Sequence, residues 1–414
     1  MVSAPSIPLI HPKQPTRVVE GQLVKHLLQE PECDRPVYVL DHHVDGPNSN
    51  RHASEDDDVT YIEGSITDAA LVASVLARVR PRVIFHAASP VASLPRSRWS
   101  EFEATNVTGT RVLLDSAAAS DTVQGFVYTS SPDVYAHPPH HNVTEAHPLV
   151  PETQRRGGGG GGVSEYVRTK AAGQRLVLAA NDGNIPNGLR TCALLPAHMY
   201  GERSAQGLRE ILDLCAGRDG SRTASSPLVQ LGAGDNLMSV ASADNVAQAH
   251  LLAAEALLDP RRARDGAAVA GESFNITDGR PVAFWNEHVR AVWKEACGAV
   301  VDEAEDEDED SAAAMLEKRV IVVPGWVYRA IAWVVRMLFR VLTLGTVSPP
   351  TAVSEQGVLY SLGEHTYSVD KLRDRLGFEP AQDHDGVMRQ AVRWELNRRR
   401  QQQQKKKGGV RKVE

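Results

Sequence analysis

Gly125–Ser130 reads GFVYTS, an apolar run of strand length that ends in hydroxyl side chains. Similar runs stand before and after it in the chain: Pro36–Asp41 (PVYVLD), Val59–Glu63, Val83–His86 (VIFH) and Arg190–Leu195 (RTCALL). The segments between these runs have helical spacing: Ala69–Val79, Asn106–Ala119 and Glu165–Ala180. Because apolar strands alternate with helices, the sequence predicts an α/β fold with a doubly wound parallel sheet covered on both faces.

The composition is that of a folded protein without a strongly basic surface. The 414 residues are 42% hydrophobic and 23% charged, which excludes a disordered chain. The formal net charge is −7, so no overall basic field favours a nucleic-acid partner. The four cysteines lie far apart without a Cys-x-x-Cys pair, which argues against disulfides and structural zinc, and we expect no metal. The first residues lack the pattern of a signal peptide.

Changes in composition divide the chain into four parts. Residues 1–300 hold the α/β array. Residues 301–319 include the run DEAEDEDED, which should repel itself and act as a solvated linker. Residues 320–398 form a smaller C-terminal part. Residues 399–414 are basic and rich in glutamine, and we expect them to be a disordered tail.

Ile321–Leu344 is apolar except for Arg329, Arg336 and Arg340. At about 100° per residue, the three arginines fall within roughly 20° of one line on a helix. A spanning helix would not carry three charges through its middle, whereas a helix lying in the membrane interface would. The pattern therefore favours a membrane-surface helix. A core helix whose arginines meet solvent or carboxylates is one alternative, and a spanning helix is the other.

Tyr166 and Lys170 are four residues apart on the helix Glu165–Ala180, so their side chains share one face. An ammonium group beside a phenol favours the phenolate and lowers its pKa, which suits a general acid–base acting on a carbinol oxygen. Tyr367 and Lys371 repeat the spacing. Only Tyr166 is preceded by a strand with hydroxyl groups at its carboxyl end, where parallel sheets bind ligands. We therefore choose Tyr166 and interpret the second pair as structural.

Asp41 closes the strand Pro36–Asp41. An acidic side chain at this place accepts hydrogen bonds from both hydroxyls of an adenosine ribose. His42 and His43 follow, and no adjacent arginine stands ready for a 2′-phosphate. The pattern favours NAD over NADP as the cofactor. The alternative is an aspartate that caps a helix or lies in a loop.

The order of the motifs resembles that of the extended short-chain dehydrogenases/reductases. The motifs are Asp41, EGSITD (Glu63–Asp68), IFHAASP (Ile84–Pro90), NVTGT (Asn106–Thr110), VYTSS (Val127–Ser131), Tyr166-x-x-x-Lys170 and LLPAHMYG (Leu194–Gly201). The later segments RTCALLPAHMYGE, LGAGDNLMSVASADNVAQAHLLAAEALL and GESFNITDGRPVAFW resemble the 3β-hydroxysteroid dehydrogenase family. Within that family, residues 18–398 are most similar to the fungal sterol-4α-carboxylate 3-dehydrogenase (decarboxylating) type.

The resemblance implies a Rossmann-like fold and a role for each matching residue. Tyr166 would be the acid–base, and Lys170 would bind the nicotinamide ribose and lower the pKa of the phenol. Ser131 would be the catalytic hydroxyl, with Ser130 as the neighbouring alternative. Asp41 would hold the adenosine ribose. Further cofactor contacts are implied for Gly21, Ser65, Ile66, Ala87, Ala88, Ser89, Asn106, Pro196 and His198.

The resemblance also implies the reaction. We expect an NAD(P)-dependent oxidation of the 3β-hydroxyl of a sterol or steroid, in particular a 4α-carboxysterol that then loses CO₂. The smaller C-terminal part and insertions within residues 1–300 would bind this substrate. The expected partners are the apolar substrate and a membrane surface, and the resemblance allows a homodimer. The expected location is the cytoplasmic face of the endoplasmic reticulum membrane, or the cytoplasm.

The amino-terminal turn departs from the family pattern. Related enzymes open with a strand and a glycine-rich turn that holds the cofactor's pyrophosphate. The corresponding stretch here is HPKQPTRVVEGQLVKHLL, in which only Gly21 remains and prolines remove backbone donors. An active enzyme with an unusual turn, a catalytically silent binding protein, and an ordinary enzyme with a foreign first segment therefore compete. A 3β-hydroxysteroid dehydrogenase/isomerase, or a reductase of another hydrophobic alcohol–ketone pair, is the alternative enzyme.

Overall fold

The computed structural model describes most of the chain, and its contacts define two units. The described residues are 6–9, 18–30, 36–42, 58–90, 99–152, 164–182, 188–202, 208, 211–212, 228–259, 261–262, 268–301, 320–344, 349 and 353–410. Unit 1 comprises Met1–Ala197, Asp244–Gly279 and Tyr367–Ala381. Unit 2 comprises His198–Ala243, Arg280–Thr366 and Gln382–Glu414. The segments of the two units alternate along the chain. The division of the sequence into residues 1–300 and 320–398 stays a prediction.

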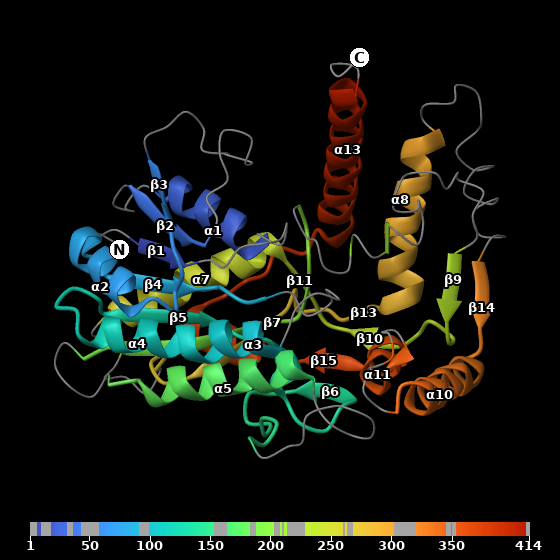
Figure 1. The fold of residues 1–414 in the computed structure, drawn as a ribbon, viewed down its shortest axis with the longest axis horizontal. Coiled ribbons are helices and arrows are strands. Elements are labelled where there is room, and N and C mark those ends of the chain that lie inside the picture. Colours follow the sequence, from blue (N-terminus) through green and yellow to red (C-terminus); the bar gives the residue numbers. More distant parts are fainter. Residues whose placement is uncertain are drawn as a thin grey trace. The chain divides into compact units, whose positions relative to one another are not determined.

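Unit 1 is built on a seven-stranded parallel sheet with the strand order β12-β7-β5-β4-β1-β2-β3 (Figure 1). Its strands are β1 (Ser6–Leu9), β2 (Val37–Asp41), β3 (Val59–Glu63), β4 (Val83–His86), β5 (Gly125–Thr129), β7 (Arg190–Pro196) and β12 (Ser273–Ile276). This order confirms the predicted doubly wound α/β sheet. The chain runs outward from β1 in one direction and from β4 in the other, so the switch point lies between these two strands.

Helices cover both faces of this sheet. The helical segments of unit 1 are α1 (Val18–Gln29), α2 (Ala69–Val79), α3 (Trp99–Glu103), the π-helix η1 (Ala104–Gly109), α4 (Thr110–Ala118), the short η2 (Pro132–Val134), α5 (Glu165–Ala179), α7 (Ala243–Leu258) and α12 (Asp370–Leu376). The strand β6 (His140–Val143) follows η2. The single helix predicted over residues 106–119 is wrong at its start. Helical structure begins at Trp99 and passes through the π-helical turn that contains Asn106.

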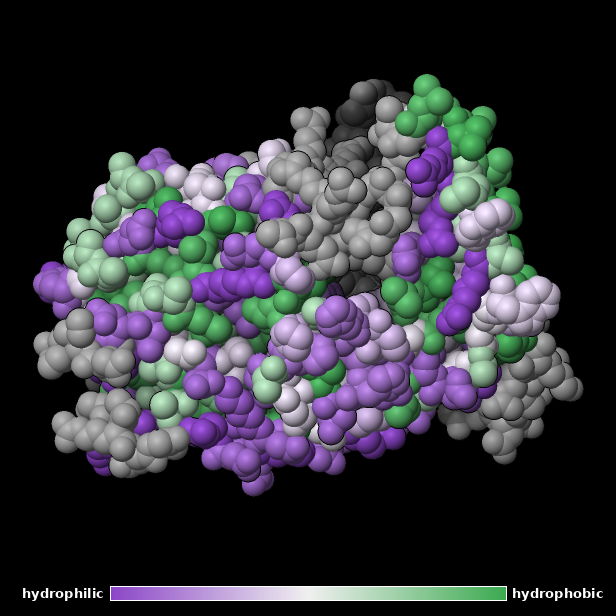
Figure 2. Space-filling model, turned by 90° about the horizontal axis from the view of Figure 1, so that it is seen from below, coloured by the Kyte–Doolittle hydropathy of each residue, from purple (hydrophilic) through white to green (hydrophobic). Residues whose placement is uncertain are grey.

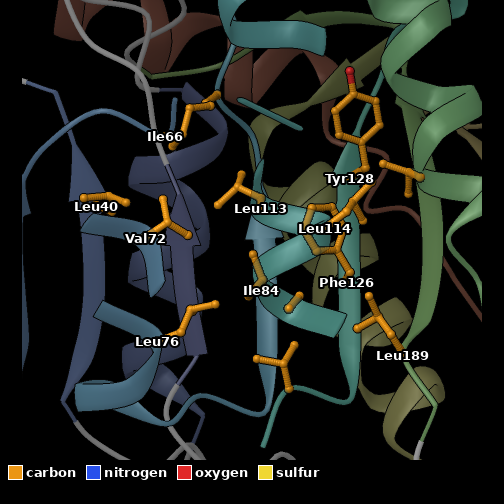
Figure 3. Packing of buried hydrophobic residues seen from close by; sticks show 14 of the residues in the cluster. Leu40, Ile66, Val72, Leu76, Ile84, Leu113, Leu114, Phe126, Tyr128 and Leu189 are labelled. Atoms are coloured by element: carbon orange, nitrogen blue, oxygen red, sulfur yellow. The ribbon is translucent and has the colours of Figure 1, made fainter. Parts of the chain in front are cut away.

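The core of unit 1 lies between the sheet and the helices α2, α4 and α5 (Figure 3). Leu40 and Phe126 of the sheet meet Val72 of α2 and Leu113 of α4, each at most 1% exposed. Alternate residues of a strand point to opposite faces. The residue after Ile84 in β4 therefore faces α7, where the ring of Phe85 lies 6.5 Å from the ring of His250.

Unit 2 combines short strands with helices around a second core. The strands are β8 (His198–Tyr200), β9 (Leu228–Leu231), β10 (Leu237–Met238), β11 (Val240–Ser242), β13 (Val282–Ala283), β14 (Val320–Val323) and β15 (His365–Tyr367), whose last residue belongs to unit 1. The helices are η3 (Phe284–Val289), α8 (Arg290–Val301), α10 (Gly325–Leu342), α11 (Glu355–Leu362) and α13 (His384–Val410). Trp293 of α8 packs with Met388 of α13 in this core.

The structure corrects two predicted segments of unit 2. The apolar run Ile321–Leu344 begins as β14, which pairs with β9, and Pro324 separates this strand from α10. Residues 399–410 continue α13 instead of forming a disordered tail, while residues 411–414 lie outside the described part. Gln, Lys and Arg are good helix formers, and Glu395 pairs with Arg398 and Arg399 one turn further on. The linker residues 302–319 lie outside the described residues, as does the run of six glycines at 157–162.

Candidate active site

Tyr166 and Ser131 meet at the carboxyl end of the sheet of unit 1. Ser131 is the second residue after β5, and Tyr166 lies in the first turn of α5. The Oγ of Ser164 caps this helix by accepting the backbone N–H of Val167 at 3.3 Å. Burial raises the pKa of the Tyr166 phenol above its ordinary value, and a side-chain hydrogen bond with Ser131 offsets part of this effect. The two side chains can therefore bind one substrate oxygen together.

Lys170 lies on α5, one helical turn after Tyr166. Its Nζ donates a 2.8 Å hydrogen bond to the carbonyl oxygen of Thr129 and lies 4.9 Å from the centre of the Tyr128 ring. The residue is only 2% exposed. Burial lowers the pKa of Lys170 from 10.5 to about 7. The amine is thus close to its titration point at neutral pH, which is a typical feature of functional lysines.

The pKa of Tyr166 departs from the expected direction. The sequence predicts a lowered pKa because of Lys170, whereas burial raises the pKa of the phenol above its ordinary value in this structure. The negative charge of Asp133 raises it further, and Ser131 opposes this effect. Desolvation therefore outweighs the hydrogen bond that Ser131 provides.

Asp133 is a residue that the sequence reasoning missed. It lies in η2, two residues after Ser131, and its backbone N–H donates to Ser131 Oγ at 3.3 Å. The residue reaches solvent, but protein atoms crowd its carboxyl group, and desolvation raises its pKa. The hydrogen bond with Ser131 and the charge of His140 act in the opposite direction. Its position after the strand VYTSS was the available signal.

Ser130 and Thr129 are engaged in supporting contacts. Ser130 Oγ donates to Oε1 of Gln174 at 2.7 Å, so Ser131 is the hydroxyl that contacts Tyr166. The Nε2 of His250 lies 2.8 Å from Thr129 Oγ1, and its Nδ1 lies 2.7 Å from the Val246 carbonyl oxygen. Burial lowers the pKa of His250 to about 4, so the ring is neutral. Nδ1 must donate to the carbonyl, and Nε2 therefore accepts from Thr129. Sequence reasoning did not identify Gln174 or His250.

Asn106 lies in η1, against α5. Its Nδ2 donates to Thr169 Oγ1 at 3.0 Å, while in the described part of the chain its buried Oδ1 has no hydrogen-bond partner. Gly173 of α5 allows this close approach. A Cβ there would lie 2.5 Å from the Asn106 carbonyl oxygen and 2.6 Å from the Tyr128 hydroxyl. A π-helical turn of this kind often marks a functional site.

The remaining candidates for cofactor contact lie at several strand ends. Asp41 is fully buried at the end of β2. Ser65 Oγ shares a 2.8 Å hydrogen bond with Thr67, and Ile66 packs in the core at 2% exposure. The segment Ala87–Ala88–Ser89 follows β4, and Ser89 Oγ donates to the Pro90 carbonyl.

The other three candidates lie apart from this group. Gly21 lies within the first turn of α1, after the connection 10–17 that falls outside the described residues. Pro196 ends β7 in unit 1. His198 belongs to unit 2, where its Nδ1 lies 2.7 Å from the Tyr360 hydroxyl and its ring packs against Phe284. The structure thus does not bring His198 together with the others inside unit 1.

The second Tyr-x-x-x-Lys pair serves structural contacts. The Tyr367 hydroxyl lies 3.1 Å from Nδ1 of His140, whereas Lys371 Nζ lies 2.6 Å from a Glu272 carboxylate oxygen. The two side chains have separate partners, so they do not form one site. Gly377, with φ 65°, ends the following helix in the left-handed conformation.

The arrangement of polar groups in unit 1 fits a nicotinamide dinucleotide. Such a cofactor lies across the carboxyl edge of the sheet at the switch point. Asp41 stands on β2 on one side of that point, and Ser131 follows β5 on the other. A carboxylate suits the ribose hydroxyls, and the phenol and hydroxyl suit the nicotinamide end. Among the described residues, no group of His, Cys, Asp and Glu has the arrangement of a metal site.

Comparison with family models then connects this geometry to a family. Residues 19–301 match the model of the 3-beta hydroxysteroid dehydrogenase/isomerase family. The chain belongs to this family. Because the match covers β2 to α8, it includes the Ser131–Tyr166–Lys170 group and the whole parallel sheet except β1.

Two curated relatives of this chain are both named as decarboxylating sterol dehydrogenases. The sterol-4-alpha-carboxylate 3-dehydrogenase, decarboxylating, of Saccharomyces cerevisiae is 31% identical over 286 residues, which are 68% of this chain and 70% of the relative. The protein of the same name from Gibberella zeae is 26% identical over 336 residues, 80% of this chain and 97% of the relative.

Solved structures show the same fold. A dTDP-glucose 4,6-dehydratase from Streptomyces venezuelae, with NAD bound, gives a TM-score of 0.60 at 20% identity and covers 94% of this chain and 96% of that one. A UDP-glucose 4-epimerase from Thermotoga maritima gives 0.60 at 17% identity, with 94% and 99% covered. The Rossmann-like, extended short-chain dehydrogenase fold predicted from the sequence is thereby confirmed.

Proposed function

We propose that this family member is an NAD-dependent sterol dehydrogenase that oxidises the 3β-hydroxyl of a 4α-carboxysterol, which then loses CO₂. The observation that carries the proposal is the convergence of Ser131, Tyr166 and Lys170 at the carboxyl end of the parallel sheet. The names of the curated relatives supply the substrate class.

In the proposed reaction, the Tyr166 phenolate takes the proton of the 3β-hydroxyl while Ser131 donates a hydrogen bond to the same oxygen. NAD⁺, when bound, supplies the acceptor for the hydride that leaves C3. The product is a β-keto acid. Its carboxylate carbon–carbon bond breaks, the electron pair enters the new ketone as an enolate, and CO₂ leaves. A proton then returns to C4. This step needs no dedicated decarboxylating residue.

The cofactor assignment rests on Asp41. Its carboxylate at the end of β2 would accept hydrogen bonds from the adenosine ribose, which favours NAD over NADP. Lys170, whose Nζ lies at the carboxyl end of β5, would donate to the nicotinamide ribose. Additional cofactor contacts in unit 1 are proposed for Gly21, Ser65, Ile66, Ala87, Ala88, Ser89, Asn106 and Pro196, while the contact of His198 in unit 2 stays a prediction from the sequence.

The other readings of the sequence are less well supported. The polar groups of the site remain together, which does not favour a silent binding protein. The names of the curated relatives favour the decarboxylating dehydrogenase over a 3β-hydroxysteroid dehydrogenase/isomerase and over a reductase of another alcohol–ketone pair.

The substrate partitions into bilayers, and α10 offers a surface for reaching it there. Tyr328 and Ala332 pack against unit 2, while the opposite side of the helix carries exposed apolar side chains. Trp326 is 74% exposed, Trp333 57% and Val341 70%. Arg329, Arg336 and Arg340 run along the border of this apolar face, where they would meet lipid headgroups.

Hydrophobic residues beside a line of hydrophilic ones are visible at the right of Figure 2. Among the described residues, no helix has the length and apolarity that a membrane crossing requires. We therefore propose that α10 lies on the membrane surface, at the cytoplasmic face of the endoplasmic reticulum. A cytoplasmic enzyme is the alternative, and a homodimer stays a prediction.

The proposed function is tested by incubating the purified full chain with NAD⁺ and a 4α-carboxysterol in detergent micelles. NADH and CO₂ should form in equal amounts. Replacing the substrate by a 3β-hydroxysteroid without a carboxylate should remove CO₂ release, and replacing NAD⁺ by NADP⁺ should lower the rate. A chain that binds no NAD⁺ at millimolar concentration in a calorimetric titration would not be this dehydrogenase.

A further inference from the structure

Unit 2 contains a cavity of about 300 Å³ at the amino-terminal end of α10. The loop 231–236 forms one wall. Gly325, Trp326 and Arg329 of α10 form another, and Leu362 of α11 completes the lining. A cavity of this volume is at the small end of the range for ligand sites.

The loop that forms this cavity has a fixed shape. Gly232 and Gly234 have φ angles of 76° and 85°, in the left-handed region that favours glycine. The buried side chain of Gln230 donates to the carbonyl oxygens of Gly232 and Ala233 at 3.3 and 3.1 Å. Its Oε1 in turn accepts from Arg290 Nη2 at 2.9 Å. The loop wall of the cavity is therefore held in place by a buried hydrogen-bond network.

Two side chains of opposite charge line the cavity. Arg329 and Asp235 are both exposed, and among the residues that the structure describes neither has an ion-pair partner. Trp326, 74% exposed, lies on the same lining. Guanidinium groups bind phosphates, whereas carboxylates and tryptophan faces bind ammonium groups. A simple anion would match Arg329 but would be repelled by Asp235.

We propose that this cavity binds the headgroup of a zwitterionic phospholipid, with the phosphate on Arg329 and the ammonium group at Asp235 and Trp326. The proposal rests on the membrane-docking role proposed for α10. The same helix carries the exposed apolar face, so acyl chains would lie along that face while the headgroup occupies the cavity. The enzyme would then bind the headgroup of a phosphocholine-type or phosphoethanolamine-type lipid, in addition to inserting the apolar face of α10 into the bilayer.

The first experiment measures binding of soluble glycerophosphocholine to the full chain by equilibrium dialysis. The expected result is saturable binding that is weakened about tenfold by Arg329→Gln and also about tenfold by Asp235→Asn. Arg340→Gln is the matched control, because Arg340 lies on the same line of α10 but does not line the cavity. It should change the binding less than about twofold.

Inorganic phosphate distinguishes a zwitterion site from an anion site. It should bind more weakly than glycerophosphocholine, and Asp235→Asn should strengthen its binding because a repelling charge is removed. Equal binding of the two compounds, or unchanged glycerophosphocholine binding in Asp235→Asn, would overturn the proposal.

The second experiment uses phosphatidylcholine vesicles and cosedimentation. Soluble glycerophosphocholine should compete with vesicle binding by the unchanged chain. Vesicle binding without this competition would leave the apolar face as a docking surface but refute the headgroup site. Absence of any vesicle binding would refute both membrane proposals. Formation of NADH from a sterol in detergent micelles reports the proposed catalytic function separately from either result.

Discussion

Lys170 reaches from α5 to the end of β5, where its Nζ donates to the carbonyl oxygen of Thr129 at 2.8 Å. This bond joins the helix that carries Tyr166 to the strand that precedes Ser131. The amine is buried in this position, and burial lowers the pKa of Lys170 to about 7. Burial disfavours the protonated form of this lysine, so the position favours a functional role for Lys170 over a stabilising one.

The buried amine makes stability depend on pH. Between about 7 and the ordinary value of 10.5, the unfolded chain binds a proton at Lys170 that the folded chain does not. Its contribution therefore makes the folded state more stable as the pH rises through this window, by up to ~1.4 kcal/mol per pH unit. Lys170→Met should remove this contribution. The measurement is urea unfolding of both chains between pH 7 and 10, and identical pH slopes would contradict the assigned burial.

Tyr166→Phe should remove turnover while leaving NAD⁺ binding within about twofold, because the phenol transfers the proton and its ring remains in place. General acid–base groups contribute factors of about 10² to 10⁴, so a loss of that size is expected. Tyr367→Phe is the matched control, since it belongs to the other Tyr-x-x-x-Lys pair and contacts His140. Its turnover should stay close to that of the unchanged chain. Substantial activity in Tyr166→Phe would show that the acid–base is misassigned.

Much of the sheet was predictable from local sequence, because strands buried on both faces are apolar runs. The strand predicted over residues 125–130 ends one residue earlier in the structure. The strand predicted over residues 190–195 extends one residue further, to Pro196. The strand Ser6–Leu9 was not predicted. It contains only four residues, two of them Ser6 and Pro8, and its place in the sheet comes from pairing with β2 and β4. Local composition carries little of that information.

The candidate site was predictable only in part. The spacing of Tyr166 and Lys170 placed them on one helix face, and Ser131 was found from the strand end before it. The raised pKa of Tyr166 was not predictable, because desolvation depends on how many protein atoms surround the phenol. His250 was missed for a related reason, since it contacts Thr129 across 121 residues of sequence.

Asp133→Asn should shift the pH dependence of sterol oxidation. The charge of Asp133 raises the pKa of Tyr166, so its removal lowers that pKa and makes the phenolate accessible at lower pH. The acid limb of the kcat/KM profile should move down by up to about one pH unit. Asp121→Asn is the control, because Asp121 is 74% exposed and paired with Arg80 on the surface. An unchanged or upward-shifted limb in Asp133→Asn would contradict this electrostatic coupling.

Gly173→Ala should separate η1 from α5. The added Cβ would lie 2.5 Å from the Asn106 carbonyl oxygen, too close for the two backbones to keep their positions. Overpacking of this kind costs about 1–3 kcal/mol. Turnover should fall as well, because α5 carries Tyr166. Gly125→Ala is the matched buried control, where the nearest atom would be Val83 Cγ2 at 3.4 Å. Thermal unfolding of both variants tests this prediction. Equal stability of the two variants would contradict it, because η1 would then be able to shift away from α5 without loss of stability.

The exposed apolar face of α10 should dominate membrane binding. Trp333 is 57% exposed and Val341 is 70% exposed, and both lie away from the packed residues Tyr328 and Ala332. The double variant Trp333→Ser, Val341→Ser removes apolar area that the bilayer would bury, so its partition into phosphatidylcholine vesicles should fall about tenfold or more. Val229→Ser is the control, since Val229 is 46% exposed but belongs to β9. Circular dichroism and sterol oxidation in micelles should change little, because neither substituted side chain packs in a core. Vesicle binding that both variants retain equally would place the docking surface elsewhere on the chain.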